Sequence, residues 1–399
     1  MRTTSFCRVF APCVLVLLAG AAAAGPLEPA PGPVAPTFKT LQQIEPRIPI
    51  STQTTPGDAA SSFRITQPGS YYLDGDLMCE AGKIGIRVEA SNVSIDLNGF
   101  SMVGNGGTTA IADHGNEQLP DIEHLTVRNG TIRDFSNGVF SYLCRSFHLT
   151  ELTVIGGSYA MGLNGSAAIE SCHVLNARYA FEIQGAGTTL RNCTVVGGQV
   201  GFGVTGATME NCAVSSAQRG IRLGGSVARG CTATACSTVG VELQGDAQVI
   251  EGQVSDSTVG VLVTGHRCAV RSMNISAMSS NGIEIELGSF GTSVIGNTMT
   301  GCAGAGIFVD KFSTSIIIKD NVTTDHKYGI WVDGTNNVVT GNIAGAHASG
   351  GFNYRIVAAN RFGPIVRALS NASLVNVTSS SGDVAGTITS DQTFANISY

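Results

Sequence analysis

The stretch Gly201-Phe-Gly-Val-Thr-Gly206 decides the fold, because close copies of it recur along the chain. Each copy has a small residue, an apolar residue, any residue, an aliphatic residue and then usually a polar residue or glycine. Apolar side chains that alternate with a period of two are typical of a short β-strand. Successive copies lie 19 to 24 residues apart, and they begin at Ala160, Ala180, Gly201, Gly220, Gly240, Gly260, Gly282, Gly306 and Gly329.

A second, shorter apolar pattern lies between each pair of copies, as in Ile169-Glu-Ser-Cys-His-Val174. Two short strands per unit cannot bury their apolar faces alone, but stacked units bury them against one another. The leucine-rich consensus and its helical half are absent, and a propeller blade needs about 40 residues. We therefore predict an all-β fold, a single-stranded right-handed parallel β-helix (solenoid) of roughly a dozen coils over residues 63–349, with N- and C-terminal caps.

Both ends of the chain depart from the repeat. Arg2 and Arg8 precede an apolar run that ends in small residues, which predicts a signal peptide over residues 1–24. Residues 25–62 are then a proline-rich spacer and N-terminal lead-in, and residues 350–399 a C-terminal cap and tail. No later segment is long and apolar enough to span a membrane. We expect a protein that is secreted, periplasmic or at the cell surface.

The composition excludes several classes of protein. The chain has 399 residues, 51 of them Gly, without the every-third-residue period of collagen, and its 43% hydrophobic content is too high for a disordered chain. The formal net charge is −6. Because nucleic-acid-binding proteins carry a basic patch or stripe, this balance predicts no nucleic-acid partner.

Residues at the same place in successive units form columns. Side chains stacked on parallel strands point the same way, whereas the two cysteines of a disulfide point toward each other. We therefore expect buried free thiols in the most regular column, with disulfides as the alternative. That column contains Cys172, Cys193, Cys212 and Cys231, and continues less strictly with Met273, Asn297, Asn321 and Asn342.

Two positions earlier, charges alternate in sign on consecutive units. Opposite charges on neighbouring strands attract one another, so this column predicts a structural ion-pair ladder rather than a site. Arg222 and Glu242 are expected to form one further salt bridge in an outward-facing pair. The alternating column is Glu170, Arg191, Glu210, Arg229, Glu251 and Arg271.

Candidate functional residues gather near the C-terminal end of the repeats. Three successive copies read Gly282-Ile-Glu-Ile-Glu286, Gly306-Ile-Phe-Val-Asp310 and Gly329-Ile-Trp-Val-Asp333. Aliphatic side chains face inward, and the outward side chains form the candidate ligand-binding set. That set is Glu284, Glu286, Phe308, Asp310, Trp331 and Asp333.

Glu286, Asp310 and Asp333 are expected to stack on adjacent strands. Like charges this close need a cation, a shared proton or nearby bases to offset their repulsion. Three interpretations stay open: a Ca²⁺ site formed by these carboxylates, an acid and base acting on a sugar stacked on the indole, or a solvated acidic edge whose aspartates begin turns. Lys311, His326 and Lys327 are nearby bases in the sequence.

The segments Ile65-Thr-Gln-Pro-Gly-Ser-Tyr-Tyr-Leu73 and Val93-Ser-Ile-Asp-Leu-Asn-Gly-Phe100, followed by the repeats, resemble secreted bacterial right-handed parallel β-helix repeat proteins of the pectin-lyase-like superfamily. The resemblance implies a coil with three parallel sheets and, for many relatives, a link to extracellular polysaccharide. The polygalacturonase motifs Asn-Thr-Asp, Gly-His-Gly and Arg-Ile-Lys are absent, and Gly265-His266-Arg267 lacks the second glycine. No catalytic residue is therefore carried over.

These observations predict an exported β-helix protein that binds extracellular or cell-surface polysaccharide. Two other classes remain: a polysaccharide lyase or glycoside hydrolase that uses the C-terminal acidic patch, and a structural surface fibre or adhesin. Calcium is the one cofactor that the patch suggests. The sequence does not determine the glycan or the oligomeric state.

Overall fold

The computed structural model describes residues 46–113, 121–141, 144–286, 288–346, 351–367, 375–377, 384–385 and 395–398. The chain divides into residues 1–46 and 47–399, and the fold below is that of the second unit. The predicted signal peptide lies outside the described residues, as does the predicted spacer up to residue 45.

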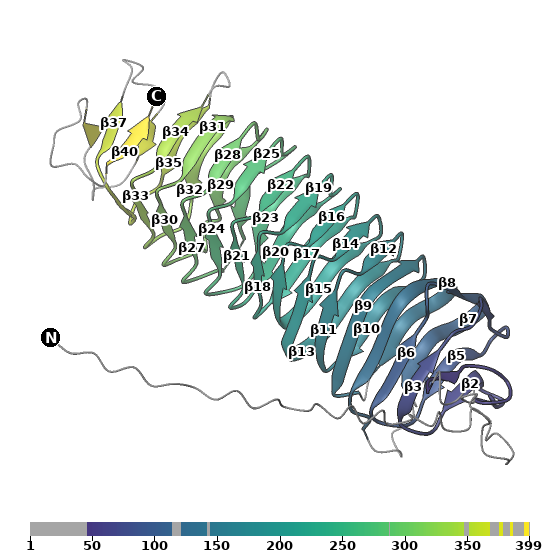
Figure 1. Cartoon of the computed structure of the whole chain (residues 1–399). Coiled ribbons are helices and arrows are strands. Elements are labelled where there is room, and N and C mark those ends of the chain that lie inside the picture. The colour runs from purple at the N-terminus through teal and green to yellow at the C-terminus, as the bar shows by residue number, and fades with distance from the viewer. Residues whose placement is uncertain are drawn as a thin grey trace, which may run out of the picture. The chain divides into compact units, whose positions relative to one another are not determined.

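The second unit is a solenoid of about 14 turns in which strands of successive turns pair in parallel (Figure 1). One turn consists of β10 (Tyr159–Asn164), β11 (Ser166–Glu170) and β12 (His173–Leu175), after which β13 (Tyr179–Arg191) begins the next turn. Tyr159 pairs with Tyr179, and Glu170 pairs with Arg191, so each strand meets its equivalent one turn later. The described residues contain no helix. This confirms the predicted all-β, right-handed parallel β-helix.

The strands form three ladders, which we name after the turn above: the first contains β10, the second β11 and the third β12. Long strands such as β13 bend at a corner and contribute to two ladders. The first ladder contains β2 (Ser61–Ile65), β5 (Ile84–Val88), β7 (Ser101–Asp113), β8 (Leu125–Ser141), β10, β13, β15 (Val200–Glu210), β17 (Arg219–Gly224), β20 (Val239–Gln244), β23 (Val259–Val263), β26 (Ile283–Ile285), β29 (Ala305–Val309), β32 (Tyr328–Val332), β35 (Phe352–Ile356) and β38 (Val375–Val377).

The second and third ladders complete each turn. Besides parts of β8, β13 and β15, the second contains β1 (Ile48–Pro49), β3 (Gly69–Tyr72), β6 (Val93–Asp96), β9 (Ser146–Ile155), β11, β18 (Val227–Arg229), β21 (Gln248–Ile250), β24 (Ala269–Arg271), β27 (Ser293–Ile295), β30 (Ile317–Lys319), β33 (Val338–Thr340) and β36 (Arg361–Phe362). Besides parts of β7, β8 and β9, the third contains β4 (Leu77–Met78), β12, β14 (Thr194–Val196), β16 (Ala213–Ser215), β19 (Thr232–Thr234), β22 (Gln253–Ser255), β25 (Asn274–Ser276), β28 (Thr298–Thr300), β31 (Val322–His326), β34 (Ile343–Ala346), β40 (Asn396–Ser398), β37 (Ile365–Arg367) and β39 (Val384–Ala385).

Each turn has three strands, as the resemblance implied, and not only the two that the apolar pattern predicted. The pattern over Ile169–Val174 covers both β11 and β12, with a sharp corner between them at Ser171, whose φ is +54°. The equivalent corner residues Asn192 and Asn211 are also left-handed, a conformation that asparagine tolerates better than most residues.

The ladders extend beyond residues 63–349 at both ends. β1 pairs with β3 inside the segment predicted as lead-in, and β35 pairs with β32 inside the segment predicted as cap. The backbone N–H and C=O groups of β3 and β32 that face the ends of the repeat region are therefore paired.

One continuous apolar core fills the interior from Ile50 to Ile365. Inward side chains stack on their equivalents, as Phe181 does on Phe202 with ring centroids 4.8 Å apart. The nine cysteines of the described residues are buried and free, in agreement with the predicted buried thiols.

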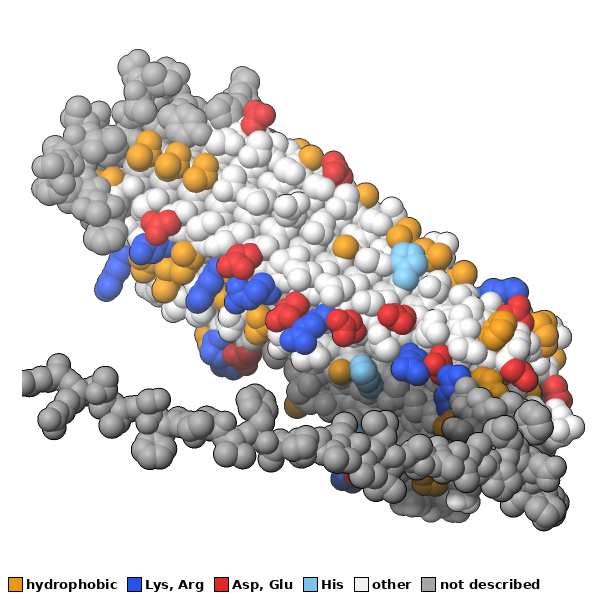
Figure 2. Space-filling view, in the orientation of Figure 1, with side chains coloured by type: hydrophobic (Ala, Val, Ile, Leu, Met, Phe, Trp, Pro, Cys, Tyr) orange, Lys and Arg blue, Asp and Glu red, His pale blue; other side chains and the backbone are white. Residues whose placement is uncertain are grey.

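Charged side chains gather on the outside of the second ladder. Figure 2 shows them in a row over β18, β21, β24 and β30, beside a broad uncharged area over β16, β19, β22 and β25. Two pairs of the predicted charge column form salt bridges, Arg191–Glu210 at 2.8 Å and Arg229–Glu251 at 2.9 Å. The register places Ile250, not Glu251, between Arg229 and Arg271, so the predicted column is interrupted there and Glu251 lies at the following corner. This column is therefore structural.

Candidate functional site

The predicted site residues lie on the outer face of the first ladder, on three neighbouring strands. Glu284 pairs in register with Phe308, and Phe308 with Trp331, so these side chains occupy the same outward position on β26, β29 and β32. Arg355 of β35 continues this column beyond Trp331.

The indole ring of Trp331 packs against three neighbouring side chains. Its ring meets that of Phe308 edge-on at 5.3 Å and that of Tyr328 at 4.6 Å, and the guanidinium of Arg355 lies 4.2 Å from the ring centroid. The contact with Arg355 is a cation–π interaction. The indole Nε1 is buried and has no hydrogen-bond partner. The half-buried indole is thus a rigid apolar element of the surface.

The three carboxylates follow the ends of these strands and stack as predicted. The backbone N–H of Glu286 donates to Val263, that of Asp310 to Ile285, and that of Asp333 to Val309, which places them one turn apart. Burial raises the pKa of Glu286, and the negative charges of Glu284, Glu242 and Asp310 raise it further.

These carboxylates do not fit a Ca²⁺ ion. Asp310 accepts a hydrogen bond from the backbone N–H of Phe312 at 3.2 Å, and Asp333 lies 3.7 Å from the guanidinium of Arg355. Within the described ranges, no three His, Cys, Asp or Glu side chains are grouped to hold a metal. Because Ca²⁺ takes six to eight oxygen ligands, a stack in which Asp310 and Asp333 have separate partners gives it no cage.

The nearby bases are engaged elsewhere. The ammonium of Lys311 lies over the ring of Phe312, and that of Lys327 over the ring of Tyr328. His326 is buried, and its Nδ1 accepts a hydrogen bond of 2.9 Å from the backbone N–H of Cys302. The cation beside the acidic column is instead Arg355, which sequence reasoning did not include.

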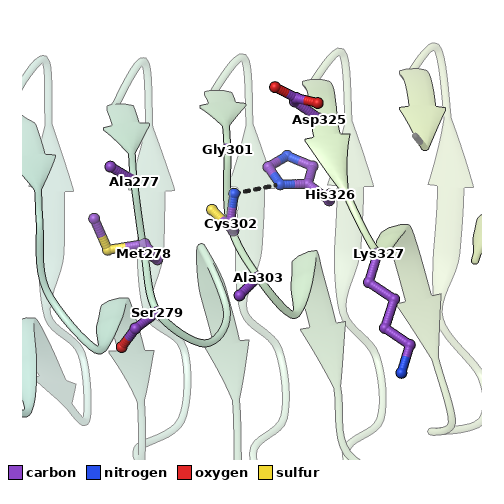
Figure 3. A pocket seen from close by; sticks show the side chains of 9 residues that line it. All are labelled: Ala277, Met278, Ser279, Gly301, Cys302, Ala303, Asp325, His326 and Lys327. Atoms are coloured by element: carbon purple, nitrogen blue, oxygen red, sulfur yellow. Dashed lines mark hydrogen bonds between the residues drawn. The ribbon is translucent and has the colours of Figure 1, made fainter. Parts of the chain in front are cut away.

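A groove lies beside Trp331, where the third ladder turns into the first. Its part next to the indole has a volume of about 350 Å³ and is lined by Ser280, Asn281, Phe308, Tyr328 and Trp331, among others. A neighbouring hollow of about 580 Å³ shares Ser279, Ala303 and Lys327 with it. Figure 3 shows this hollow, with Asp325 and Lys327 on either side of the inward-pointing His326. We call the two parts together the Trp331 groove.

The groove exists because two successive turns have small side chains where the next turn has large ones. Ser279 and Ala303 stand where the next turn has Lys327, and Ala277 and Gly301 stand where it has Asp325. Sequence analysis missed Tyr328 and Asn281, because each copy of the repeat was read from its glycine onward and these residues stand directly before Gly329 and Gly282. The run of Ala, Ser and Gly at matching positions of two adjacent turns was the available signal.

Polar groups along the groove are oriented by hydrogen bonds. Asn281 donates to Glu284 at 2.9 Å, and its Oδ1 accepts from the backbone N–H of Ala305 at 2.8 Å. The groove therefore combines a fixed amide and carboxylate with aromatic rings and the exposed ammonium of Lys327.

The expected salt bridge between Arg222 and Glu242 is wrong. Arg222 binds Glu182, two turns away, with its Nη2 2.7 and 2.9 Å from the two carboxylate oxygens. Gly203 lies between them in the ladder and has no side chain to separate them. Glu242 instead lies 3.7 Å from Arg219.

No part of the described chain forms a helix that is long and apolar enough to cross a membrane.

The comparisons with known proteins agree with this architecture. Residues 219–362 match the family described as "Right handed beta helix region". No curated protein matches the chain.

Several solved structures have a similar fold. A tailspike protein mutant of E. coli bacteriophage HK620, in complex with a pentasaccharide, is 14% identical with a TM-score of 0.53, and the match covers 79% of this chain and 71% of that one. A double mutant of the same tailspike is 13% identical with a TM-score of 0.53, over 83% and 72% of the two chains. The A-module of mannuronan C-5 epimerase AlgE6 from Azotobacter vinelandii is 14% identical with a TM-score of 0.45, over 80% and 92%. At these identities the likeness to the tailspike structures is one of fold, and it agrees with the family match on a right-handed parallel β-helix.

Proposed function

We propose that this protein binds a polysaccharide on the outer face of the first ladder, with the Trp331 groove as a principal contact. The observation that carries the proposal is the groove wall, in which Trp331 and Tyr328 lie next to polar groups fixed by hydrogen bonds. Ligand pockets typically combine such aromatic walls with a few well-placed polar groups.

The chemistry of a sugar ring suits this surface. A pyranose presents an apolar face of C–H groups, which packs against an aromatic ring, and hydroxyl groups at its edge, which bond to carboxylates and amides. Trp331 needs little ordering on binding, because Phe308, Tyr328 and Arg355 already hold it. The tailspike structure, a complex with a pentasaccharide, supports the proposal, since a protein of similar fold binds a saccharide. We further propose that the protein meets its polysaccharide after export, as the N-terminal sequence predicts.

The proposal is tested with the full chain on a glycan array, followed by affinity electrophoresis in gels that contain the retained polysaccharide. We expect Trp331→Ala to reduce retention at least tenfold, because the apolar wall is lost, and Lys327→Ala to reduce it less. Phe312→Ala is the matched control, since Phe312 is an aromatic residue of the same region that is 59% exposed and outside the groove.

Melting temperatures of the variants show whether the fold is intact. Retention of the Trp331→Ala and Lys327→Ala variants at the level of the parent would contradict the proposal, as would the absence of any retained glycan. Release of unsaturated or reducing-end products from the retained polymer would instead favour the lyase or hydrolase alternative.

A further inference from the structure

A second pocket opens on the outer face of the first ladder, far from the Trp331 groove. Its volume is about 210 Å³, and it is lined by residues of β8, β10 and β13. Gly162 stands in the outward column between Phe140 and Glu182, so this position lacks a side chain. The ring of Phe140 lies over Gly162, with two ring carbons 2.5 Å from the place where a Cβ would stand, and we call the hollow beside it the Tyr159 pocket.

Aromatic rings form one wall of the Tyr159 pocket. The ring of Tyr159 lies 5.6 Å from that of Phe140 and is stacked on that of Tyr179 at 4.9 Å. The guanidinium of Arg178 covers Tyr179 at 5.3 Å. The wall is thus braced on both sides, as Trp331 is in its groove.

Polar side chains form the opposite wall. Both oxygens of Glu182 are bound by Arg222, which fixes the carboxylate while its remaining lone pairs stay available. Glu182 is 21% exposed, and Arg222 neutralises its charge. Asn164 and Gln184 pair in register at the next outward position and add two amides. A fixed carboxylate, two amides and aromatic rings match a neutral polyhydroxyl ring, and the volume lies below the 300–1,000 Å³ of pockets for larger ligands.

The two sites lie in one straight column. From Gly162 to Trp331 the register passes through Glu182, Gly203, Arg222, Glu242, Leu262, Glu284 and Phe308. These are eight strand-to-strand steps of about 4.8 Å, hence a separation of about 38 Å. Because one continuous β-helix carries both sites, their spacing is rigid.

We infer that the Tyr159 pocket is a second saccharide subsite, for a neutral sugar unit, and that one polysaccharide strand bridges it and the Trp331 groove. The inference rests on the proposed function for the groove. A strand that spans both sites converts the second contact into an intramolecular one, which raises affinity by a factor of about 10² to 10⁴ without new contacts. Fragments shorter than about 38 Å reach one site only. The protein therefore selects for chain length.

The test uses the full chain and size-fractionated hydrolysates of three neutral polymers: dextran, galactomannan and mixed-linkage β-glucan. Binding is measured by calorimetry and affinity electrophoresis for the parent, Trp331→Ala, Tyr159→Ala, Asn164→Ala and the Phe312→Ala control. Asn164 is exposed, so its variant tests the pocket even where Tyr159→Ala fails to fold.

For the polymer that binds, we expect affinity to rise at least a hundredfold once fragments exceed the span. Trp331→Ala and Tyr159→Ala each remove that rise, whereas Phe312→Ala keeps it. Unchanged long-chain affinity of both pocket variants overturns the second subsite while leaving the groove proposal intact. If the pocket variants lose long-chain affinity while Trp331→Ala keeps it, the groove proposal and the bridging are refuted. The pocket itself would then stand as a saccharide site. Affinity independent of length, or no binding to any of the three neutral polymers, overturns the inference.

Discussion

At the residue scale, one core column changes its chemistry along the molecule. The thiols of Cys193 and Cys212 lie 3.3 and 3.5 Å from carbonyl oxygens two residues earlier, and that of Cys193 also lies 3.8 Å from the carbonyl of Ile169 in the preceding turn. Asn321, five turns beyond Cys212 in this column, connects turns more closely. Its Nδ2 donates to Asn342, and its Oδ1 accepts from both the backbone and the side-chain N–H of Asn297, all at 2.9 Å. The amide column therefore links neighbouring turns by hydrogen bonds of 2.9 Å, whereas the thiol of Cys193 reaches the preceding turn only at 3.8 Å.

We expect Asn321→Ala to destabilise the C-terminal turns by about 3 kcal/mol. The variant leaves the buried backbone N–H of Asn297 without its partner, at about 1–3 kcal/mol, and it opens a small cavity as well. Cys231→Ala in the same column is the matched control and should cost about 1 kcal/mol, because it removes only a weak thiol bond and one sulfur atom. Native-state hydrogen exchange measures both values, at Asn297 and its neighbours for Asn321→Ala and in the turns next to Cys231 for Cys231→Ala. Equal effects of the two variants would show that the amide ladder adds no stability.

At the element scale, the sequence predicts some strands of each turn and not others. The repeat predicted the first-ladder strands, and with them the register of Glu284, Phe308 and Trp331, because strand position follows directly from the period. It did not separate β11 from β12, because the apolar pattern continues across the corner at Ser171.

The remaining parts of the candidate site depend on differences in side-chain size between equivalent positions of neighbouring turns. The Trp331 groove arises from side-chain size at loop positions, which no strand pattern reports. The pairing of Arg222 with Glu182 depends on a glycine in between, since charge alternation alone favours the nearest neighbour. Such contacts follow only once the columns are aligned residue by residue.

The C-terminal strand β40 closes the third ladder from a distance in sequence. It pairs with β34 and β37, and Asn396 accepts bonds from the backbone and side-chain N–H of Asn342 at 3.1 Å. The hydroxyl of Tyr354 donates to the carbonyls of Asn342 and Ile397 at 2.6 and 3.0 Å. This strand therefore continues the column of asparagine side chains and pairs with the backbone of β34.

Removing residues 395–399 is expected to weaken the last turns selectively. The truncation leaves β34 with an unpaired edge and Asn342 without its amide partner. Hydrogen–deuterium exchange followed by mass spectrometry should show faster exchange in residues 338–367 and unchanged exchange in residues 84–230. Exchange in residues 338–367 that matches the intact chain would show that β40 is dispensable, and Asn396→Ala separates the side-chain contribution from that of the strand.

At the scale of the whole molecule, stacking makes stability a local property. The strands of each turn pair only with those of the turns before and after it, so solenoid proteins behave largely as chains of neighbouring interactions rather than as one cooperative globule. The two proposed saccharide sites can therefore keep a fixed spacing while the ends of the stack open independently.

The alkylation rates of buried thiols can measure such local opening. Burial raises the pKa of the Cys79 thiol to about 12 and that of Cys302 to about 11, above the ordinary value of about 8.5. Since the thiolate is the reactive form, both residues should resist alkylation at pH 8 until their turns open.

Peptide mapping after timed alkylation in mild denaturant should separate the two positions. Asn321→Ala is expected to accelerate labelling of Cys302, because the altered turn follows it directly and holds its backbone N–H through His326. Cys79, at the other end of the stack, should react at the rate of the parent protein. Equal acceleration at both cysteines would mean that the turns unfold as one unit, and the rigid spacing of the two sites would then depend on the stability of every turn between them.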